Sequence, residues 1–324
     1  MIKRAYIDAT DLSTYNNMRN LVFEILNQTP LDVVISCNDY AKVNAWPEKL
    51  NQDFDGRVTV NDEVPTESVH DDSGIYIRAL HTAQFPFKKT KREIIANLEY
   101  LKFTNKKPTS DVRITELGEL LQTNKPVVVF GSICMEEYKL VADTAKLLQD
   151  SYNIVIAPRL LETSSLDELC GTLIENQITL GMKSSRATFK NNKIILLDTV
   201  GELVEYYGIG AVNVIGGGFG DSKHGSHNPL ESLVYSVPTI IGKSHDRQKK
   251  IVDAFKESSL LIAQKTDSSE DLVSAIHYGS QLLSTPRKED ILLTHSKLLE
   301  STSQITRQTI QDIVDSILKP TTKR

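Results

Sequence analysis

In this 324-residue chain, the residues whose types and spacing best suit ligand binding lie in segment 212–231, VNVIGGGFGDSKHGSHNPLE. An apolar run ends there in three glycines, and a helix is predicted to begin at Asn228. Glycines let the backbone approach a ligand closely, and the free amides of a helix start attract anions. The segment has no GxGxxG and no GxxxxGK[ST] pattern, so it does not fit the common dinucleotide or P-loop sites.

Glu231 has two interpretations. With Asn228 as N-cap and Pro229 at the first helical position, Glu231 falls third and completes a capping box. Alternatively, its carboxylate accepts hydrogen bonds from the two hydroxyls of a ribose. His227 is either a water-exposed loop residue or part of the site. His224 and His227 lack the Cys or carboxylate partners of a metal site, so no metal is expected.

Other polar side chains follow apolar runs elsewhere in the second half. Arg159 follows IVIAP, where its guanidinium either binds phosphate or forms a surface salt bridge. Ser132 follows VVVFG, and Glu136 and Glu137 come next, where a helix start favours carboxylates. In DTVGEL, residues 198–203, a capping box between the Thr and the Glu is a sufficient explanation.

These side chains need a scaffold whose apolar runs end at one edge. Strands are predicted at 126–131, 153–157, 193–198, 212–215, 238–241 and 260–263. Helices are predicted near 136–150, 165–176, 201–208, 228–236, 245–257 and 269–283. Such alternation predicts a parallel sheet with right-handed crossovers, which binds ligands at the carboxyl ends of its strands.

The first half is shorter and less regular. Strands are predicted at 4–8, 32–36 and 75–79, helices near 15–28 and 89–103, a loop or weak hairpin at 51–74, and a linker at 104–110. A helix near 111–122 precedes the second sheet, and helices at 288–302 and 304–319 follow it. The expected domains are residues 1–108, 109–303 and a C-terminal helix 304–324, for which a return to the first domain is left open.

Composition excludes several classes of protein. Hydrophobic residues make up 40% and charged residues 24%, which is unlike a disordered chain or a coiled coil. No apolar run approaches the length of a membrane span, and an early Asp8 argues against a signal peptide. Cys37, Cys134 and Cys170 form no CxxC pair, so a reducing, cytoplasmic setting is expected. The net charge of −5 argues against a nucleic-acid partner.

One basic segment departs from this balance. Residues 85–107 hold six Lys and one Arg against two Glu, with aromatic residues between them. One interpretation is a solvated helix face. The other is peripheral contact with an anionic membrane surface or with a phosphorylated glycolipid.

Together these segments resemble one family, the Kdo transferases, which move 3-deoxy-D-manno-octulosonic acid from CMP-Kdo to a lipid A precursor. The resemblance covers about residues 95–256. It is carried by Gly131-Ser132, Pro158-Arg159, DTVGEL at 198–203, GGGF at 216–219, HNPLE at 227–231 and ANLEY at 96–100. DTxGEL and HNPLE are specific in combination.

The resemblance implies an α/β fold of the GT-B type, with two Rossmann-like domains facing a cleft and a reduced N-terminal domain. It implies inversion at the anomeric carbon without an obligatory metal or cofactor, and a role in lipopolysaccharide biosynthesis at the inner membrane surface. The acceptor would be a glycolipid or saccharide. The residues implied in binding the CMP-sugar donor are Ser132, Arg159, Gly217, Gly218, Asn228 and Glu231.

The sequence departs from the family at the catalytic base. The family's Glu lies in Ser-Val-Gly-Glu after the first strand, whereas residues 9–14 read ATDLST. Asp8 and Asp11 are therefore the candidate bases. Two alternatives stay open: a GT-B homologue that binds a nucleotide or a partner without turnover, and an enzyme with another nucleotide-sugar donor. An epimerase or hydrolase of the same shape is a weaker third.

Overall fold

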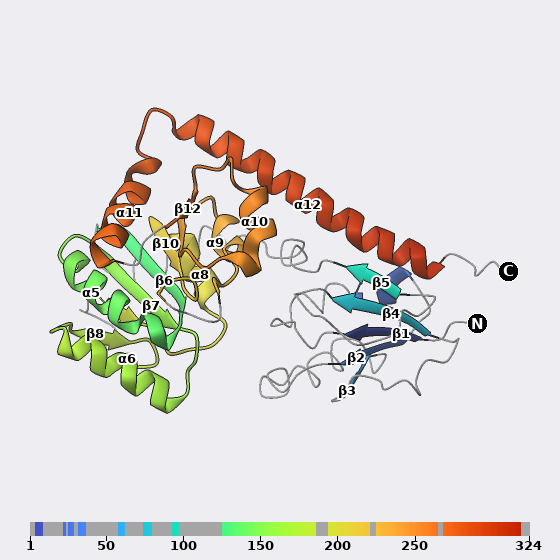
Figure 1. The fold of residues 1–324 in the computed structure, drawn as a ribbon, viewed down its shortest axis with the longest axis horizontal. Coiled ribbons are helices and arrows are strands. Elements are labelled where there is room, and N and C mark those ends of the chain that lie inside the picture. The colour runs from blue at the N-terminus through green and yellow to red at the C-terminus, as the bar shows by residue number, and fades with distance from the viewer. Residues whose placement is uncertain are drawn as a thin grey trace. The chain divides into compact units, whose positions relative to one another are not determined.

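The computed structural model describes residues 4–8, 22–23, 25–28, 32–36, 58–61, 74–79, 93–96, 125–185, 194–220, 225–264 and 268–318. The chain divides into two units (Figure 1). Unit 1 comprises residues 1–106 and 301–324, and unit 2 comprises residues 107–300. Each unit contains one sheet whose described strand pairs are all parallel.

The sheet of unit 1 has the order β3-β2-β1-β4-β5. Its strands are β1 (Arg4–Asp8), β2 (Asp32–Ser36), β3 (Val58–Asn61), β4 (Gly74–Ala79) and β5 (Glu93–Ala96). The strands predicted at 4–8 and 32–36 are confirmed, and β4 begins one residue before its prediction. Because β1 lies between β2 and β4, the chain order of the strands reverses at β1.

Two predictions in unit 1 were wrong. The helix expected near 89–103 contains β5, which pairs with β4, so the tertiary pairing overrides the helical pattern there. The loop or hairpin expected at 51–74 contains β3, a parallel neighbour of β2. Residues 22–23 and 25–28 are helical within the helix predicted at 15–28. The linker 104–110 and the helix 111–122 lie outside the described residues.

The sheet of unit 2 has the order β12-β11-β10-β6-β7-β9-β8. Its strands are β6 (Val127–Ile133), β7 (Asn153–Pro158), β8 (Leu180–Met182), β9 (Ile194–Leu196), β10 (Val212–Ile215), β11 (Thr239–Ile241) and β12 (Leu261–Ala263). All six predicted strands are present. β8 was not predicted; its central residue is Gly181, and glycine is depleted in strands.

The helices of unit 2 follow the prediction less closely. They are the 3₁₀ turns η3 (Met135–Glu137) and η4 (Asp246–Gln248), with α5 (Tyr138–Leu148), α6 (Thr163–Glu175), α8 (Leu203–Ile209), α9 (Leu230–Leu233), α10 (Lys249–Ala254), α11 (Ser269–Leu282) and α12 (Lys288–Leu318). The residues of α12 from 301 onward belong to unit 1. The helices predicted at 288–302 and 304–319 are one continuous helix. The helix predicted at 228–236 is a single turn.

Apolar layers cover both faces of the second sheet. Val128 and Phe130 of β6 pack with residues of α5, α6 and α11, whereas Val127 and Val129 pack with residues of α8. Successive side chains of a strand point to opposite faces, so an unbroken apolar run is what a strand covered on both sides requires. The result is a three-layer α/β unit (Figure 1).

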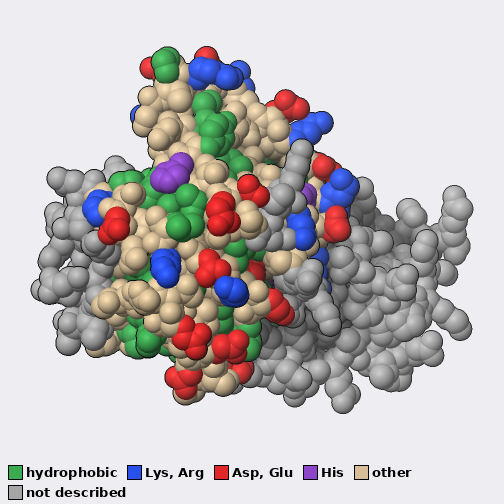
Figure 2. All heavy atoms as spheres, turned by 60° about the vertical axis from the view of Figure 1, so that its left-hand side comes forward, with side chains coloured by type: hydrophobic (Ala, Val, Ile, Leu, Met, Phe, Trp, Pro, Cys, Tyr) green, Lys and Arg blue, Asp and Glu red, His purple; other side chains and the backbone are tan. Residues whose placement is uncertain are grey.

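The surface agrees with the composition. Among the described residues, no helix is both long and apolar enough to cross a bilayer. Figure 2 shows acidic side chains gathered in the lower part of one face, among uncharged ones.

Candidate functional site

The chain order of the strands in the second sheet reverses at β6, which lies between β10 and β7. In an open parallel sheet, the loops that leave such a point separate and form a crevice at the carboxyl ends of the strands. Ser132 lies near the carboxyl end of β6, Gly216 to Gly218 follow β10, and Arg159 follows β7. The topology therefore brings the predicted segments to one edge.

Glycines hold the backbones of these loops together. We call Gly131, Gly216, Gly217, Gly218 and Gly242 the glycine seam. A Cβ at Gly216 would lie 2.5 Å from the carbonyl oxygen of Ser132, and one at Gly242 would lie 2.1 Å from that of Gly218. Gly217 has a φ of +85°. Gly216, Gly217 and Gly242 require glycine because main chain packs directly on main chain there.

Glu137 connects the two sides of the seam. Its side chain is 1% exposed, and its carboxylate accepts hydrogen bonds from the backbone N–H groups of Cys134, Gly217 and Phe219, at 2.8–3.0 Å. Burial raises the pKa of the Glu137 carboxyl, and the backbone hydrogen bonds oppose that shift. The capping role expected of Glu137 is only part of its function, since two of its donors come from the β10 loop.

Tyr207 of α8 packs against the carboxyl end of β6. A Cβ at Gly131 would lie 1.9 Å from the Tyr207 hydroxyl oxygen. Burial raises the pKa of Tyr207 well above its ordinary value, the nearby Glu231 carboxylate raises it further, and a hydrogen bond with the Ser132 side chain opposes both. The hydroxyl therefore stays protonated, and it associates two predicted donor-binding residues, Ser132 and Glu231.

The backbone at Ser132 is bent. Ser132 has a φ of 56°, and the register between β6 and β7 shifts between Gly131 and Ile133. This irregularity extends β6 two residues beyond the predicted end and turns the Ser132 side chain out of the regular alternation. Non-glycine residues rarely adopt a positive φ of this size, and backbone strain of this kind concentrates at functional sites.

A second group of contacts surrounds His227. Its Nε2 lies 3.6 Å from the Cys134 Sγ, and its backbone N–H donates to the Gly216 carbonyl at 2.9 Å. Burial raises the pKa of the Cys134 thiol to about 12; Glu137 and Glu136 add to the rise, whereas the nearby Arg159 guanidinium lowers it. The glycine seam therefore lies close to Cys134, Arg159 and His227.

The start of α9 differs from its prediction. The helix begins at Leu230, so Pro229 is the N-cap and Glu231 is the second helical residue. The capping box predicted between Asn228 and Glu231 was therefore wrong. The Asn228 Oδ1 accepts the Leu230 N–H at 2.9 Å, which fixes the turn into the helix. Because Glu231 does not cap the helix, its half-buried carboxylate is not explained by capping.

The DTVGEL segment also differs from its prediction. Helix α8 begins at Leu203 with Glu202 as N-cap, so Thr199 is not the cap. Instead, the Thr199 hydroxyl donates to the Glu202 carboxylate, and Asp198 accepts hydrogen bonds from the backbone and the hydroxyl of Ser184. These contacts tie the loop after β9 to the loop after β8.

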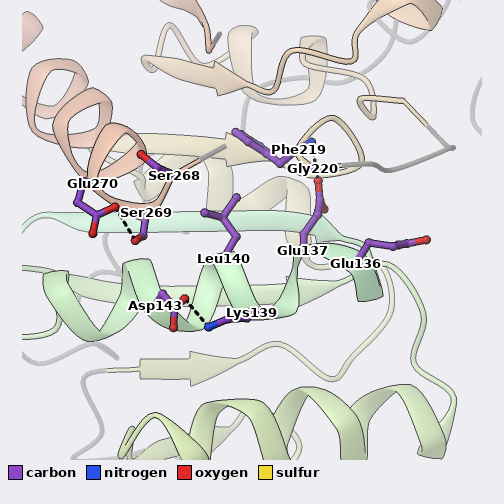
Figure 3. Close-up of a pocket in the computed structure, with 10 residues that line it drawn as sticks. All are labelled: Glu136, Glu137, Lys139, Leu140, Asp143, Phe219, Gly220, Ser268, Ser269 and Glu270. Atoms are coloured by element: carbon purple, nitrogen blue, oxygen red, sulfur yellow. Dashed lines mark hydrogen bonds and ion pairs between the residues drawn. The ribbon is translucent and has the colours of Figure 1, made fainter. Parts of the chain in front are cut away.

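A hollow of about 370 Å³ lies at the same edge of the sheet (Figure 3). Its lining residues are Glu136, Glu137, Lys139, Leu140, Asp143, Phe219, Gly220, Ser268, Ser269 and Glu270. Lys139 pairs with Asp143 at 2.9 Å, and the Ser269 hydroxyl donates to Glu270 at 3.1 Å. We call this the acidic hollow. Four carboxylates against one ammonium do not suit a phosphate, and none of the six predicted donor-binding residues lines it.

The predicted catalytic bases are less well defined. Asp8 is the last residue of β1, at the carboxyl end of the strand where the sheet of unit 1 reverses. Asp11 and His224 lie outside the described residues. Within the described part of the chain, no group of three His, Cys, Asp or Glu side chains could hold a metal ion.

The structure brings Ser132 and Glu231 to Tyr207, and Gly217 and Arg159 to the surroundings of Cys134 and His227. Gly218 lies in the seam against Gly242, and Asn228 follows His227 directly. Sequence reasoning missed Tyr207 entirely and the bridging role of Glu137. Two consecutive tyrosines at 206–207 in a predicted helix, together with Gly131 at the end of a predicted strand, were the sequence signal that could have indicated Tyr207.

The curated relatives match only part of this chain. No family model matches the chain. A 3-deoxy-D-manno-octulosonic acid transferase of Chlamydophila psittaci is 29% identical over 133 residues, which is 41% of this chain and 30% of that protein. The chain spans less than half the length of the curated relatives it matches. The predicted resemblance to the Kdo transferases is confirmed.

Two solved structures show the fold. The C-terminal CMP-Kdo binding domain of WaaA from Acinetobacter baumannii aligns with a TM-score of 0.51 at 21% identity, over 59% of this chain and 99% of that one. A glycosyltransferase from Rickettsia africae aligns with a TM-score of 0.63 at 9% identity, over 99% of this chain and all of that one. The chain therefore has the predicted α/β architecture of the GT-B type.

Proposed function

We propose that this chain is an inverting glycosyltransferase that moves a Kdo-like sugar from a CMP-activated donor to a glycolipid or saccharide acceptor. The observation that carries the proposal is the meeting of the loops after β6, β7 and β10 with residues 227–231 at the switch point of the second sheet. The similarity to the Kdo transferases supports the same assignment.

In this proposal, unit 2 binds the donor. The loops of the glycine seam let the ligand approach the main chain, and Arg159 neutralises the phosphate as negative charge develops on the leaving group. Ser132 and Glu231, associated through Tyr207, bind hydroxyls of the nucleotide. Asn228 shapes the loop that holds this group. No step of this scheme needs a metal ion.

Unit 1 supplies the base that removes the acceptor's proton. Asp8 is the stronger candidate, because it ends the strand at the switch point of its own sheet, where ligands of parallel sheets bind. Asp11 is the second candidate. In an inverting transfer the deprotonated acceptor oxygen forms a bond to the anomeric carbon as the bond to the CMP phosphate breaks.

The direct test is CMP release from CMP-Kdo with candidate acceptors, run beside calorimetric titration with CMP. We expect Arg159→Ala to raise the Kd for CMP by about tenfold or more, as loss of a charge-assisted hydrogen bond predicts. The exposed Arg287→Ala is the matched control and should bind CMP like the unmodified chain. Tighter binding of UDP than of CMP would contradict the donor assignment.

The alternative function is nucleotide binding without turnover. The absence of the family's Ser-Val-Gly-Glu segment favours it. Asp8→Asn and Asp11→Asn, tested separately, discriminate the two functions. Loss of CMP release with unchanged CMP affinity in one variant supports catalysis by that residue. CMP binding with no release in the unmodified chain supports the alternative.

A further inference from the structure

The contact between Cys134 and His227 is not explained by the proposed roles of the donor-binding residues. Cys134 follows β6, and His227 lies 93 residues further along the chain, beside Asn228. Their Sγ and Nε2 atoms are 3.6 Å apart, within hydrogen-bond distance for sulfur. Cys134 is 5% exposed, so the sulfur atom is shielded from water, whereas His227 is half-buried.

The imidazole is held on one edge. A Cβ at Gly217 would lie 3.0 Å from its Cδ2 and 3.2 Å from its Nε2, so the glycine seam packs against the same edge that meets Cys134. The His227 backbone is fixed as well, because its N–H donates to Gly216 and its carbonyl accepts from the Ser226 hydroxyl. Nδ1 lies across the ring from this enclosed edge.

The chemistry of the pair assigns donor and acceptor. Burial and the Glu137 and Glu136 carboxylates hold the pKa of the Cys134 thiol near 12, so the sulfur keeps its proton at neutral pH. A thiol is a weak donor and a weak acceptor, whereas an unprotonated imidazole nitrogen accepts hydrogen bonds. When Nε2 is unprotonated, the S–H donates and Nε2 accepts. A neutral imidazole that accepts at Nε2 carries its proton on Nδ1.

We propose that Cys134 is a positioning residue that holds His227 in the Nδ1–H tautomer, and that this Nδ1–H donates a hydrogen bond to the phosphate of the bound sugar nucleotide. The tautomer is a property of the folded chain alone. The contact with phosphate rests on the proposed function. Arg159 lies beside the same cysteine, so a charged and a neutral donor would meet the phosphate together.

The tautomer is tested by NMR on protein labelled with ¹⁵N-histidine, at least one unit above the ordinary imidazole pKa of about 6.5. A His227→Gln variant assigns the signal. We expect His227 to show a protonated Nδ1 and an unprotonated Nε2. A proton on Nε2 in the unmodified chain overturns the inference, and that measurement needs no cysteine variant to fold.

The role of Cys134 is tested by Cys134→Ala and Cys134→Ser, with Cys170→Ala as the matched control on α6. We expect Cys134→Ala to shift His227 toward the Nε2–H tautomer and to raise the Kd for CMP about three- to tenfold, the effect of one misplaced hydrogen bond. Cys134→Ser, which keeps a donor, should restore part of both. Cys170→Ala should change neither.

The outcomes separate the two proposals. An Nδ1–H tautomer that survives Cys134→Ala overturns the positioning role. The expected tautomer shift with unchanged CMP affinity overturns the contact with phosphate. If the unmodified chain binds no CMP, the proposed function fails and the phosphate contact fails with it, whereas the tautomer experiment still decides the role of Cys134.

Discussion

The glycine seam and the acidic hollow lie at the same edge of the same sheet, yet they offer opposite chemistry. In the seam, main chain packs on main chain and amide groups predominate. In the hollow, the starts of α5 and α11 present carboxylates (Figure 3). A parallel sheet therefore specifies where a ligand binds but not which one, and the residues after each strand decide the charge.

Glu137 belongs to both regions. It lines the hollow, but its carboxylate is taken up by backbone N–H groups of the seam. The difference in charge between the seam and the hollow thus depends on the buried Glu137, whose carboxylate neutralises backbone N–H dipoles of the seam. The following experiments change one region at a time.

The largest effect is expected from Glu137→Ala. Three buried backbone N–H groups would lose their acceptor, and each unsatisfied group costs about 1–3 kcal/mol. We expect the free energy of unfolding to fall by about 3 kcal/mol or more in urea titrations, with loss of CMP binding. The exposed neighbour Glu136→Ala is the control and should stay within about 0.5 kcal/mol. An unchanged midpoint for Glu137→Ala would show that the seam does not depend on this carboxylate.

Gly131→Ala tests the packing of the seam on Tyr207. The added methyl group would overlap the Tyr207 hydroxyl, and overpacking costs about 1–3 kcal/mol. Gly171→Ala on α6 has no heavy atom within 4 Å of the new Cβ and should be neutral or stabilising. Because the closest overlap is with the hydroxyl, the double variant with Tyr207→Phe should recover part of the loss. Additive losses would mean that the two residues do not meet.

His295 tests the anchor beneath α9. It is 0% exposed; its Nε2–H donates to the Leu233 carbonyl and its Nδ1 accepts from the Ser258 hydroxyl, each at 2.8 Å. Burial lowers the pKa of His295, so below the unfolded value of about 6.5 the unfolded chain binds more protons. Stability from this group is complete above that pH and is lost as the pH falls through the lowered pKa, by at most about 1.4 kcal/mol per pH unit.

The measurement is urea unfolding of the unmodified chain and of His295→Gln across the acid range. The variant should be less stable at neutral pH and should show a shallower decline on acidification. Equal slopes for the two proteins would contradict a neutral, buried His295.

The smallest effects are expected in the acidic hollow. Asp143→Asn removes an i,i+4 pair with Lys139, whose side chain is 82% exposed, so we expect a loss of at most about 0.5 kcal/mol. Glu270→Gln should be similarly mild. Neither variant should change the Kd for CMP more than about twofold. A larger change in CMP affinity would indicate that the donor binds in the acidic hollow. It would contradict the assignment of the donor site to the glycine seam.

The sequence predicts most of unit 2 because its strands are buried on both faces. Val212–Ile215 is apolar except for the buried Asn213 and was located to the residue. The segment around β5, by contrast, has apolar residues at helical spacing, and only its pairing with β4 makes it a strand. β3 is four residues long and lies among polar ones, so local pattern alone does not reveal it.

The candidate site was predicted in part for a related reason. Motif spacing identifies loops that follow strands, so Ser132, Arg159, Gly217 and Glu231 could be proposed. Glu137 was assigned to a cap because its donors at Gly217 and Phe219 lie 80 and 82 residues away. The turn into α9 depends on one residue of register, which pattern reading does not resolve.

The glycine seam also limits which mutations the chain can absorb. At Gly216, Gly217 and Gly242 the first obstacle to a methyl group is a carbonyl oxygen of the main chain, not a side chain that can rotate away. In a library of random variants, neighbouring hydrophobic positions could exchange for one another, whereas these three would tolerate no replacement. The positions at which no variant folds would identify these glycines of the seam, and the experiment would need neither a ligand nor an assay of activity.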